Sequence, residues 1–102
     1  MLATVITNNI SAIRTLCQEH KVKELYAFGS AVTSNFTDQS DVDLLVEFQE
    51  MDVLMYADNY FDLMNKLNLV FKRETDLVTT KSINNPVFQR VVNRTKVPLY
   101  SI

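Results

Sequence analysis

The chain has 102 residues, of which 47% are hydrophobic and 22% are charged, and its formal net charge is -2 at pH 7. This balance is typical of one globular domain, residues 1–102, without room for a separate substrate-binding domain. The small negative charge gives no electrostatic footprint for nucleic acid, so we expect no direct nucleic-acid binding. The single cysteine, Cys17, excludes an internal disulfide and a cysteine-based zinc site. The chain also lacks a signal-peptide pattern and an apolar stretch long enough to span a bilayer. These features together predict a cytoplasmic protein that does not associate with a membrane.

The first half of the chain predicts a helix followed by two strands. Apolar residues recur at helical spacing over residues 5–20, at Ile6, Ile10, Ile13 and Cys17. Residues 24–28 are apolar and aromatic and end at Gly29, the only glycine, which is typical of a short buried strand. We expect a short helix from Ser30, a polar loop to residue 40 and a second strand over residues 41–48.

The second half predicts two helices and two strands. Asp52 is placed to cap a helix whose expected buried stripe is Leu54, Ala57, Phe61, Met64 and Leu67 and whose expected wet face is Asp58, Asp62 and Lys66. Residues 75–79 form a β-prone segment, and Pro86 suits the first turn of a final helix. Residues 97–100 are expected to form an edge strand because they contain Pro98. The alternation indicates a small α/β (α+β) domain, with a mixed sheet and helices packed mainly on one face.

Two acids begin the second strand. Side chains alternate along a strand, so Asp41 and Asp43 point to the same face, about 6.6 Å apart along it. Adjacent carboxylates repel each other unless a cation lies between them, and Mg²⁺ prefers such hard oxygen ligands. If the strand over residues 75–79 lies beside the second strand, Asp76 completes a cluster of three carboxylates. Three carboxylates can hold two Mg²⁺ ions, one on a triphosphate and one activating a hydroxyl.

Gly29 and Ser30 are the second half of this pattern. Glycine lets the backbone approach a phosphate closely, and a helix that begins at Ser30 directs free N–H groups toward the anion. The Ser30 hydroxyl can donate to a phosphate oxygen. Each motif is weak alone, but both lie at strand boundaries with a fixed separation, and together they predict a site for a metal-bound nucleoside triphosphate.

The pair resembles a known signature. Gly29-Ser30, ten residues and Asp41-Val42-Asp43 match the GS-x10-DxD pattern of the DNA polymerase β-like nucleotidyltransferase superfamily. The segments over residues 75–78 and 83–100 are similar to its minimal nucleotidyltransferase (MNT) branch. The resemblance implies the nucleotidyltransferase fold, with Asp41, Asp43 and Asp76 as catalytic metal ligands. It implies that Gly29 and Ser30 bind the nucleotide.

The resemblance also implies a partner and a reaction. MNT proteins are commonly encoded beside HEPN-domain proteins, as toxin–antitoxin modules. Some transfer AMP from ATP onto a tyrosine hydroxyl of the HEPN toxin and silence its RNase activity. We therefore expect ATP as the donor, Mg²⁺ as the cofactor, a HEPN toxin as the partner, and a homo- or hetero-oligomer.

One departure from the family leaves alternatives open. Many members have an arginine just after the Gly-Ser pair, whereas this chain has Ala31, Val32 and Thr33, and the cations that shortly precede Asp76 are Lys72 and Arg73. A catalytically weak antitoxin that acts by binding its partner is one alternative. Modification of a small molecule is a less favoured one, because the chain lacks the acceptor-binding domain of larger relatives. We expect the lone histidine, His20, to cap a helix or lie at the surface.

Overall fold

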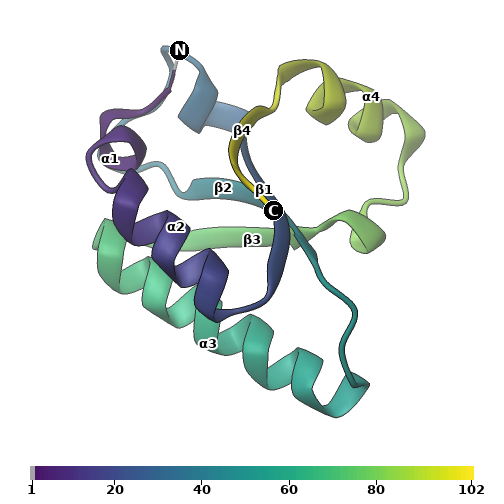
Figure 1. The fold of residues 1–102 in the computed structure, drawn as a ribbon. Helices are drawn as coiled ribbons and strands as arrows, with labels where there is room; N and C mark the ends of the chain where they lie inside the picture. Colours follow the sequence, from purple (N-terminus) through teal and green to yellow (C-terminus); the bar gives the residue numbers. More distant parts are fainter. Residues whose placement is uncertain (1) are drawn as a thin grey trace.

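A computed structural model describes residues 2–102 of the chain (Figure 1). Its elements, in chain order, are α1 (Thr4–Thr7), α2 (Ile10–Glu19), β1 (Val22–Phe28), η1 (Gly29–Val32), β2 (Val42–Phe48), α3 (Val53–Phe71), β3 (Thr75–Thr79), η2 (Thr80–Ser82), α4 (Pro86–Thr95) and β4 (Val97–Ser101). The two η elements are short 3₁₀ helices. None of the helices in this part of the chain is long and apolar enough to cross a membrane.

The four strands form one mixed sheet in the order β3-β2-β1-β4. Strand β1 is antiparallel to both β2 and β4, while β2 and β3 are parallel. The predicted mixed sheet is therefore confirmed. The strand that contains Pro98 lies at the edge, as expected, where the absence of a proline N–H costs no ladder hydrogen bond.

The two faces of the sheet are covered unequally. Helices α2 and α3 lie side by side over one face, whereas α4 lies apart from them on the other side (Figure 1). The larger apolar core lies under α2 and α3, and its largest fully buried side chains include Ile13, Leu25, Leu44, Leu63 and Leu67. A smaller cluster of Phe28, Leu45, Ile83 and Val92 lies under α4. The expectation of helices mainly on one face is confirmed.

The helix predicted over residues 5–20 is two helices. Asn8 and Asn9 separate α1 from α2, and the Asn9 side-chain amide donates to the Val5 carbonyl oxygen at 2.7 Å. Such side-chain bonds compete with the helical backbone ladder, which explains the break. Cys17 lies fully buried on α2, and burial raises the pKa of its thiol to about 12, so a packing role is favoured over reactivity.

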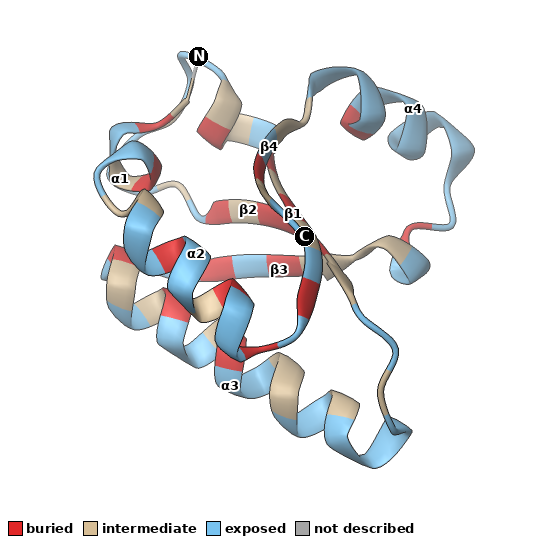
Figure 2. Ribbon diagram, viewed as in Figure 1, coloured by how far each residue is buried: buried red, intermediate tan, exposed pale blue. Residues whose placement is uncertain are grey.

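The predicted stripe of α3 is wrong over its first half. Leu54 and Phe61 are 80% and 55% exposed, whereas the buried residues of α3 are Leu63, Leu67 and Phe71. The first turns of α3 are mostly exposed in Figure 2 because they extend beyond the part of the helix that packs on the sheet. Hydrophobic periodicity cannot reveal where the covering layer ends. The predicted cap is correct, since the Asp52 carboxylate accepts from the Leu54 N–H at 2.9 Å.

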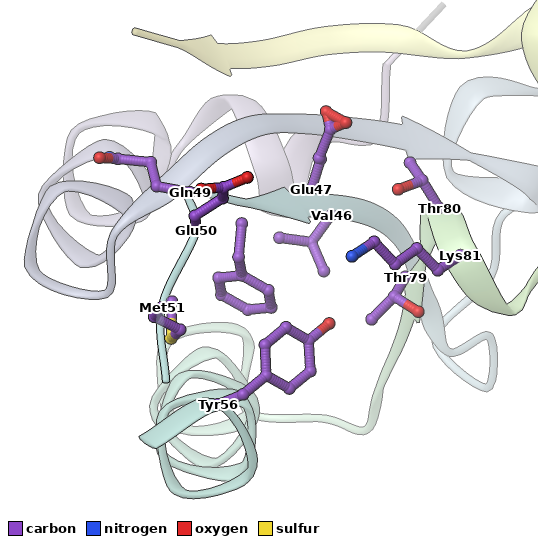
Figure 3. A pocket seen from close by; sticks show the side chains of 10 residues that line it. Val46, Glu47, Gln49, Glu50, Met51, Tyr56, Thr79, Thr80 and Lys81 are labelled. Carbon is purple, nitrogen blue, oxygen red and sulfur yellow. The ribbon is translucent and has the colours of Figure 1, made fainter. Parts of the chain in front are cut away.

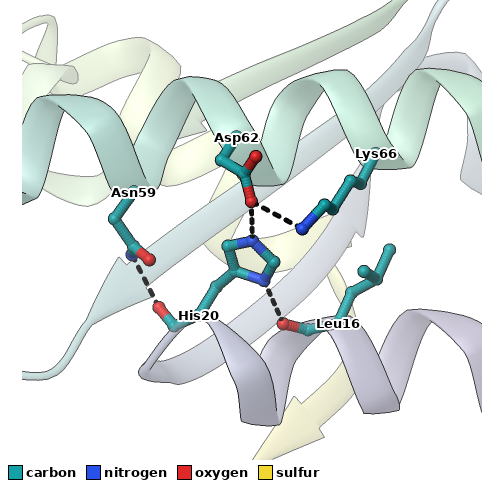
Figure 4. A network of polar contacts seen from close by, with 5 residues as sticks. All are labelled: Leu16, His20, Asn59, Asp62 and Lys66. Carbon is teal, nitrogen blue, oxygen red and sulfur yellow. Dashed lines mark hydrogen bonds and ion pairs between the residues drawn. The ribbon is translucent and has the colours of Figure 1, made fainter.

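His20 lies at the C-terminal end of α2, but it is only 4% exposed. Its Nδ1 lies 2.7 Å from the Leu16 carbonyl oxygen and its Nε2 lies 2.7 Å from Asp62 Oδ2 (Figure 4). The two ring nitrogens therefore contact α2 and α3 at once. Hydrogen bonds from Lys66 and His20 lower the pKa of the exposed Asp62 carboxyl. The capping position is confirmed, whereas the surface position is wrong because this network ties α2 to α3.

Candidate active site

The turn after β1 places the Gly29 backbone against the Asp43 side chain. Gly29 begins the 3₁₀ turn η1 with φ +65°, a conformation that L side chains rarely adopt. A Cβ atom at this position would lie 2.3 Å from Asp43 Oδ2, well inside van der Waals contact. Glycine is therefore required for both its conformation and its lack of a side chain. The helix expected from Ser30 is this single 3₁₀ turn, which starts one residue earlier.

The sheet register brings two of the predicted acids together. Asp43 pairs with Asp76 across the parallel β2–β3 ladder and with Phe28 across the β1–β2 ladder. Paired strands are about 4.8 Å apart, so the Asp43 and Asp76 backbones are direct neighbours. Asp41 lies just before the first residue of β2 and is exposed. The sequence pattern thus identified residues that the fold gathers at one end of β2 and β3.

The acids affect one another electrostatically. The pKa of Asp43 is raised from 3.8 to about 6, first by burial and then by the charges of Asp76 and Asp41. Among the described residues, no Lys, Arg or His forms an ion pair with any of the three. This repulsion is what a cation relieves, and carboxylate oxygens are ligands that Mg²⁺ prefers. The donor set therefore fits a divalent cation.

The cluster is not a finished metal site. Within residues 2–102, no three His, Cys, Asp or Glu side chains already converge closely enough to hold a metal ion. Asp43 and Asp76 are neighbours through the ladder, but Asp41 belongs to the loop that leads into β2. Completing a three-carboxylate site therefore depends on where this loop holds Asp41.

A cavity of about 580 Å³ adjoins Asp43, Asp76 and the Gly-Ser turn, whereas Asp41 is not among its lining residues. Its polar lining residues are Gly29, Ser30, Thr33, Asn35, Asp43, Asp76 and Thr95, and its apolar lining residues are Phe28, Val32, Val78 and, on α4, Phe88, Val91 and Val92. The volume is within the range of small-molecule sites. Phosphates suit the end with the Gly-Ser turn and the acids, while a nucleobase suits the apolar wall.

Sequence reasoning missed the contribution of α4 to this cavity. The sequence predicts only that a final helix, beginning at about Pro86, runs through Phe88, Val91 and Val92. In the structure Val92 is buried, whereas Phe88 and Val91 are 44% and 52% exposed and line the cavity. The rings of Phe28 and Phe88 meet edge to face at 6.1 Å between centroids. An apolar face on a helix does not by itself reveal whether a core or a ligand covers it.

A smaller cavity of about 260 Å³ lies at the other end of β2 and contains none of the predicted site residues. Glu47, Tyr56 and Lys81 are among its lining residues, with the Lys81 amine and the Tyr56 hydroxyl directed into it (Figure 3). Glu47 lies 4.0 Å from the Lys23 amine. Glu47 is therefore remote from Gly29 and Ser30 and does not belong to the acid cluster.

The cations expected near the site have other surroundings. Lys72 is the left-handed C-cap of α3, with φ +57°. The Arg73 guanidinium donates from Nη1 to the carbonyl oxygens of Thr37 and Ser40, each at 3.0 Å. Neither residue lines the cavity that contains the acids. The arginine that many relatives have after the Gly-Ser pair is therefore not replaced by Arg73.

Comparisons with known proteins point to the same chemistry. Residues 11–102 match the family described as polymerase beta, nucleotidyltransferase. MJ1379 of Methanocaldococcus jannaschii, described as a candidate protein adenylyltransferase, is 33% identical over 78% of this chain and 78% of its own length. Protein adenylyltransferase MntA of Thermococcus cleftensis is 29% identical over 78% of this chain and 77% of its own length.

Solved structures share the fold. A candidate minimal nucleotidyltransferase superposes with a TM-score of 0.78 at 26% identity, over 96% of each chain. A chain from the complex of a tri-AMPylated Shewanella oneidensis HEPN toxin with its MNT antitoxin superposes with a TM-score of 0.63 at 22% identity, over 94% of this chain and 72% of that chain. At that identity the second comparison supports the fold alone.

Proposed function

Since the chain belongs to the polymerase beta nucleotidyltransferase family and is a nucleotidyltransferase, we propose that it is an antitoxin that transfers AMP from ATP to a hydroxyl of a HEPN-domain toxin. The acceptor hydroxyl is that of a tyrosine, and the modification neutralises the toxin. Two Mg²⁺ ions and ATP complete the active site.

One observation carries this proposal: a glycine turn lies against an acid that is paired with a second acid, beside a cavity of nucleotide size. Gly29 leaves no space between the turn and Asp43, and Asp43 pairs with Asp76. All three residues line the same cavity. A purely structural role does not account for like charges on neighbouring strands with a raised pKa for Asp43.

The geometry suggests a role for each group in the reaction. The backbone N–H groups of η1 and the Ser30 hydroxyl hold the triphosphate, with the adenine against the Phe88 side of the cavity. Asp41, Asp43 and Asp76 would hold Mg²⁺, which would neutralise the phosphates and lower the pKa of the attacking hydroxyl. The hydroxyl oxygen forms a bond to the α-phosphorus, the bond between that phosphorus and the bridging oxygen breaks, and pyrophosphate leaves. Asp76 accepts the hydroxyl proton.

The partner belongs to the proposal because the acceptor lies outside this domain. The relatives named protein adenylyltransferases have a protein as acceptor. The structural neighbour from Shewanella oneidensis is a complex of an MNT antitoxin with a tri-AMPylated HEPN toxin. A hetero-oligomer with such a toxin supplies both the acceptor hydroxyl and the surface that positions it.

A second candidate is an antitoxin that acts by contact alone. It is favoured by Ala31, Val32 and Thr33 after the Gly-Ser pair, since none of them offers a positive charge to the triphosphate. Arg73 does not fill this gap, because its Nη1 is bonded to loop carbonyl oxygens. In this case the acid cluster is not needed for neutralisation.

Transfer of label separates the two candidates. The purified chain is incubated with Mg²⁺, ATP labelled at the α-phosphate and the HEPN protein encoded beside it. We expect label on the HEPN protein with the wild type and with Asp38→Asn, an exposed loop acid that serves as the control, but not with the double variant Asp41→Asn and Asp43→Asn. Nucleotide binding without transfer by the wild type would reject the enzymatic proposal. Neutralisation of the toxin by the double variant would support action by contact.

A further inference from the structure

One arginine connects the two chain segments that carry the acids. Arg73 lies between α3 and β3, three residues before Asp76. Its Nη1 donates to the Thr37 and Ser40 carbonyl oxygens, each at 3.0 Å. The guanidinium carbon also lies 4.8 Å from the centroid of the Phe36 ring. The side chain therefore extends from the start of β3 to the loop before β2.

This loop, residues 34–40, also contacts the larger core through Phe36. It is closed internally, since the Thr37 N–H donates to Ser40 Oγ at 3.0 Å and the Ser40 N–H donates to the Thr37 carbonyl oxygen at 3.1 Å. After the loop, the Val42 N–H donates to the Glu74 carbonyl oxygen at 3.1 Å, which begins the contact between β2 and β3. Asp41 lies between the Ser40 bond to Arg73 and this contact, so the two bonds hold it from both sides.

The contact is of a kind that lysine cannot reproduce. A planar guanidinium can stack on an aromatic ring while its N–H groups donate in the same plane. A lysine ammonium is a compact, strongly hydrated charge on a flexible stem, and it offers no plane to stack. Only arginine at position 73 can therefore donate to both carbonyl oxygens and stack on the Phe36 ring at the same time.

We propose that Arg73 is a positioning residue for metal binding, which tethers the loop that leads to Asp41 beside the start of β3, so that Mg²⁺ binding requires only a local movement of Asp41 toward Asp43 and Asp76. The inference rests on the proposed function for the role of the acids. The three acids have not converged in the structure, and only Asp41 lies in a loop, so the loop decides whether the metal site closes. Arg73 holds that loop from the strand that carries Asp76.

The test measures metal binding rather than turnover. Arg73→Ala and Arg73→Lys are titrated with Mg²⁺ in the presence of a non-hydrolysable ATP analogue, and the half-saturating Mg²⁺ concentration is recorded. We expect it to rise roughly tenfold in Arg73→Ala and to be only partly restored in Arg73→Lys, as for loss of an outer-shell partner. Binding of the analogue without Mg²⁺ should change less than about twofold, because Arg73 does not line the cavity.

Controls make the outcome specific. Arg90→Ala removes an exposed arginine of α4 that does not line the cavity, and it should leave the Mg²⁺ requirement unchanged. Backbone amides of residues 37–42 should exchange with solvent faster in Arg73→Ala than in the control. If Arg73→Ala does not fold, Phe36→Leu keeps the arginine but removes the stacking ring, and it should raise the Mg²⁺ requirement by a smaller factor.

Two results overturn the inference. An unchanged Mg²⁺ requirement in a folded Arg73→Ala protein would show that the loop needs no clamp. An equal loss of analogue binding with and without Mg²⁺ would make Arg73 a phosphate contact instead. Because binding is measured without an acceptor, a wild type that binds the Mg²⁺-bound analogue but transfers nothing would refute the proposed function and leave the positioning role intact.

Discussion

The two faces of the sheet share the same strands but differ in what covers them. Leu44 and Leu45 are neighbours on β2, and both are almost fully buried. Leu44 belongs to the large core under α2 and α3, whereas Leu45 belongs to the small cluster with Val92 of α4. Asp43 and Asp76 are on the Leu45 side, where the cavity lies. Strand alternation therefore separates a face that holds the fold together from a face that carries the chemistry.

The thin cover of the second face is what makes a site there feasible. Carboxylates under α2 and α3 would be fully desolvated, at a cost that no partner offsets. On the α4 side, burial is sufficient to raise the pKa of Asp43, while the cavity leaves the acids accessible to a nucleotide. The face under α2 and α3 contributes stability to the fold that the face under α4 does not supply.

The largest expected effect tests this difference between the two faces with a matched pair of variants on β2. Leu44→Ala should lower the free energy of unfolding by about 4 kcal/mol, and Leu45→Ala by about 2 kcal/mol, since the smaller cluster can relax around the lost side chain. Urea unfolding of both variants measures the difference. Nucleotide affinity of the folded protein should fall in Leu45→Ala alone, because its neighbour Val92 lines the cavity. Equal costs would show that both faces contribute equally to the fold.

The next effect concerns Gly29. In Gly29→Ala the new methyl group must displace the Asp43 carboxylate from its position at 2.3 Å, and the positive φ adds strain. A displacement of about 1 Å at a reacting group costs roughly a hundredfold in rate, so we expect AMP transfer to fall by about that factor. Ser34→Ala, an exposed change in the following loop, is the control. Transfer by Gly29→Ala within a few-fold of the wild type would contradict the close approach of turn and acid.

A smaller effect is the pH dependence of stability. The pKa of Asp43 is about 6 in the folded chain and 3.8 ordinarily, so the folded state holds the proton more tightly. The free energy of unfolding should therefore fall as the pH rises from about 4 to about 6. Asp43→Asn removes this penalty and should be more stable than the wild type at pH 7 by about 1 kcal/mol, a value reduced because water screens the half-exposed group. Its transfer activity should be lost.

Unfolding in urea between pH 3 and pH 8 checks this prediction. The difference between Asp43→Asn and the wild type should vanish below pH 4, where both side chains are neutral. Asp38→Asn changes an exposed acid of the loop and should follow the wild type at every pH. A destabilised Asp43→Asn protein at pH 7 would show that the carboxylate contributes to the fold rather than opposing it.

Local patterns predicted that Gly29, Asp43 and Asp76 come together better than they predicted the surroundings of these residues. Gly29, Asp43 and Asp76 stand at strand boundaries, and strand pairing alone brings such positions together. The chain therefore contained enough information to place the acids. Their roles as ligands and base remain predictions.

The features that sequence reasoning missed depend on distance and layer size. The link from His20 to Asp62 joins residues that are 42 positions apart. The exposure of Leu54 depends on where the sheet ends beneath α3, which no periodicity records. The break at Asn9 was missed because its side-chain bond to Val5 competes with a helical pattern that is otherwise continuous.

The smallest expected effect tests whether the α4 wall belongs to the site. Phe88 lines the cavity and is 44% exposed, while the adjacent Val87 is 68% exposed and does not line it. Phe88→Ala should weaken ATP binding by roughly fivefold, about 1 kcal/mol of aromatic contact, with little change in the unfolding midpoint. Val87→Ala should leave binding unchanged, and calorimetric titration with an ATP analogue measures both. If the two variants bind equally well, the base does not lie against α4, and the cavity on this side of the sheet binds the phosphates alone.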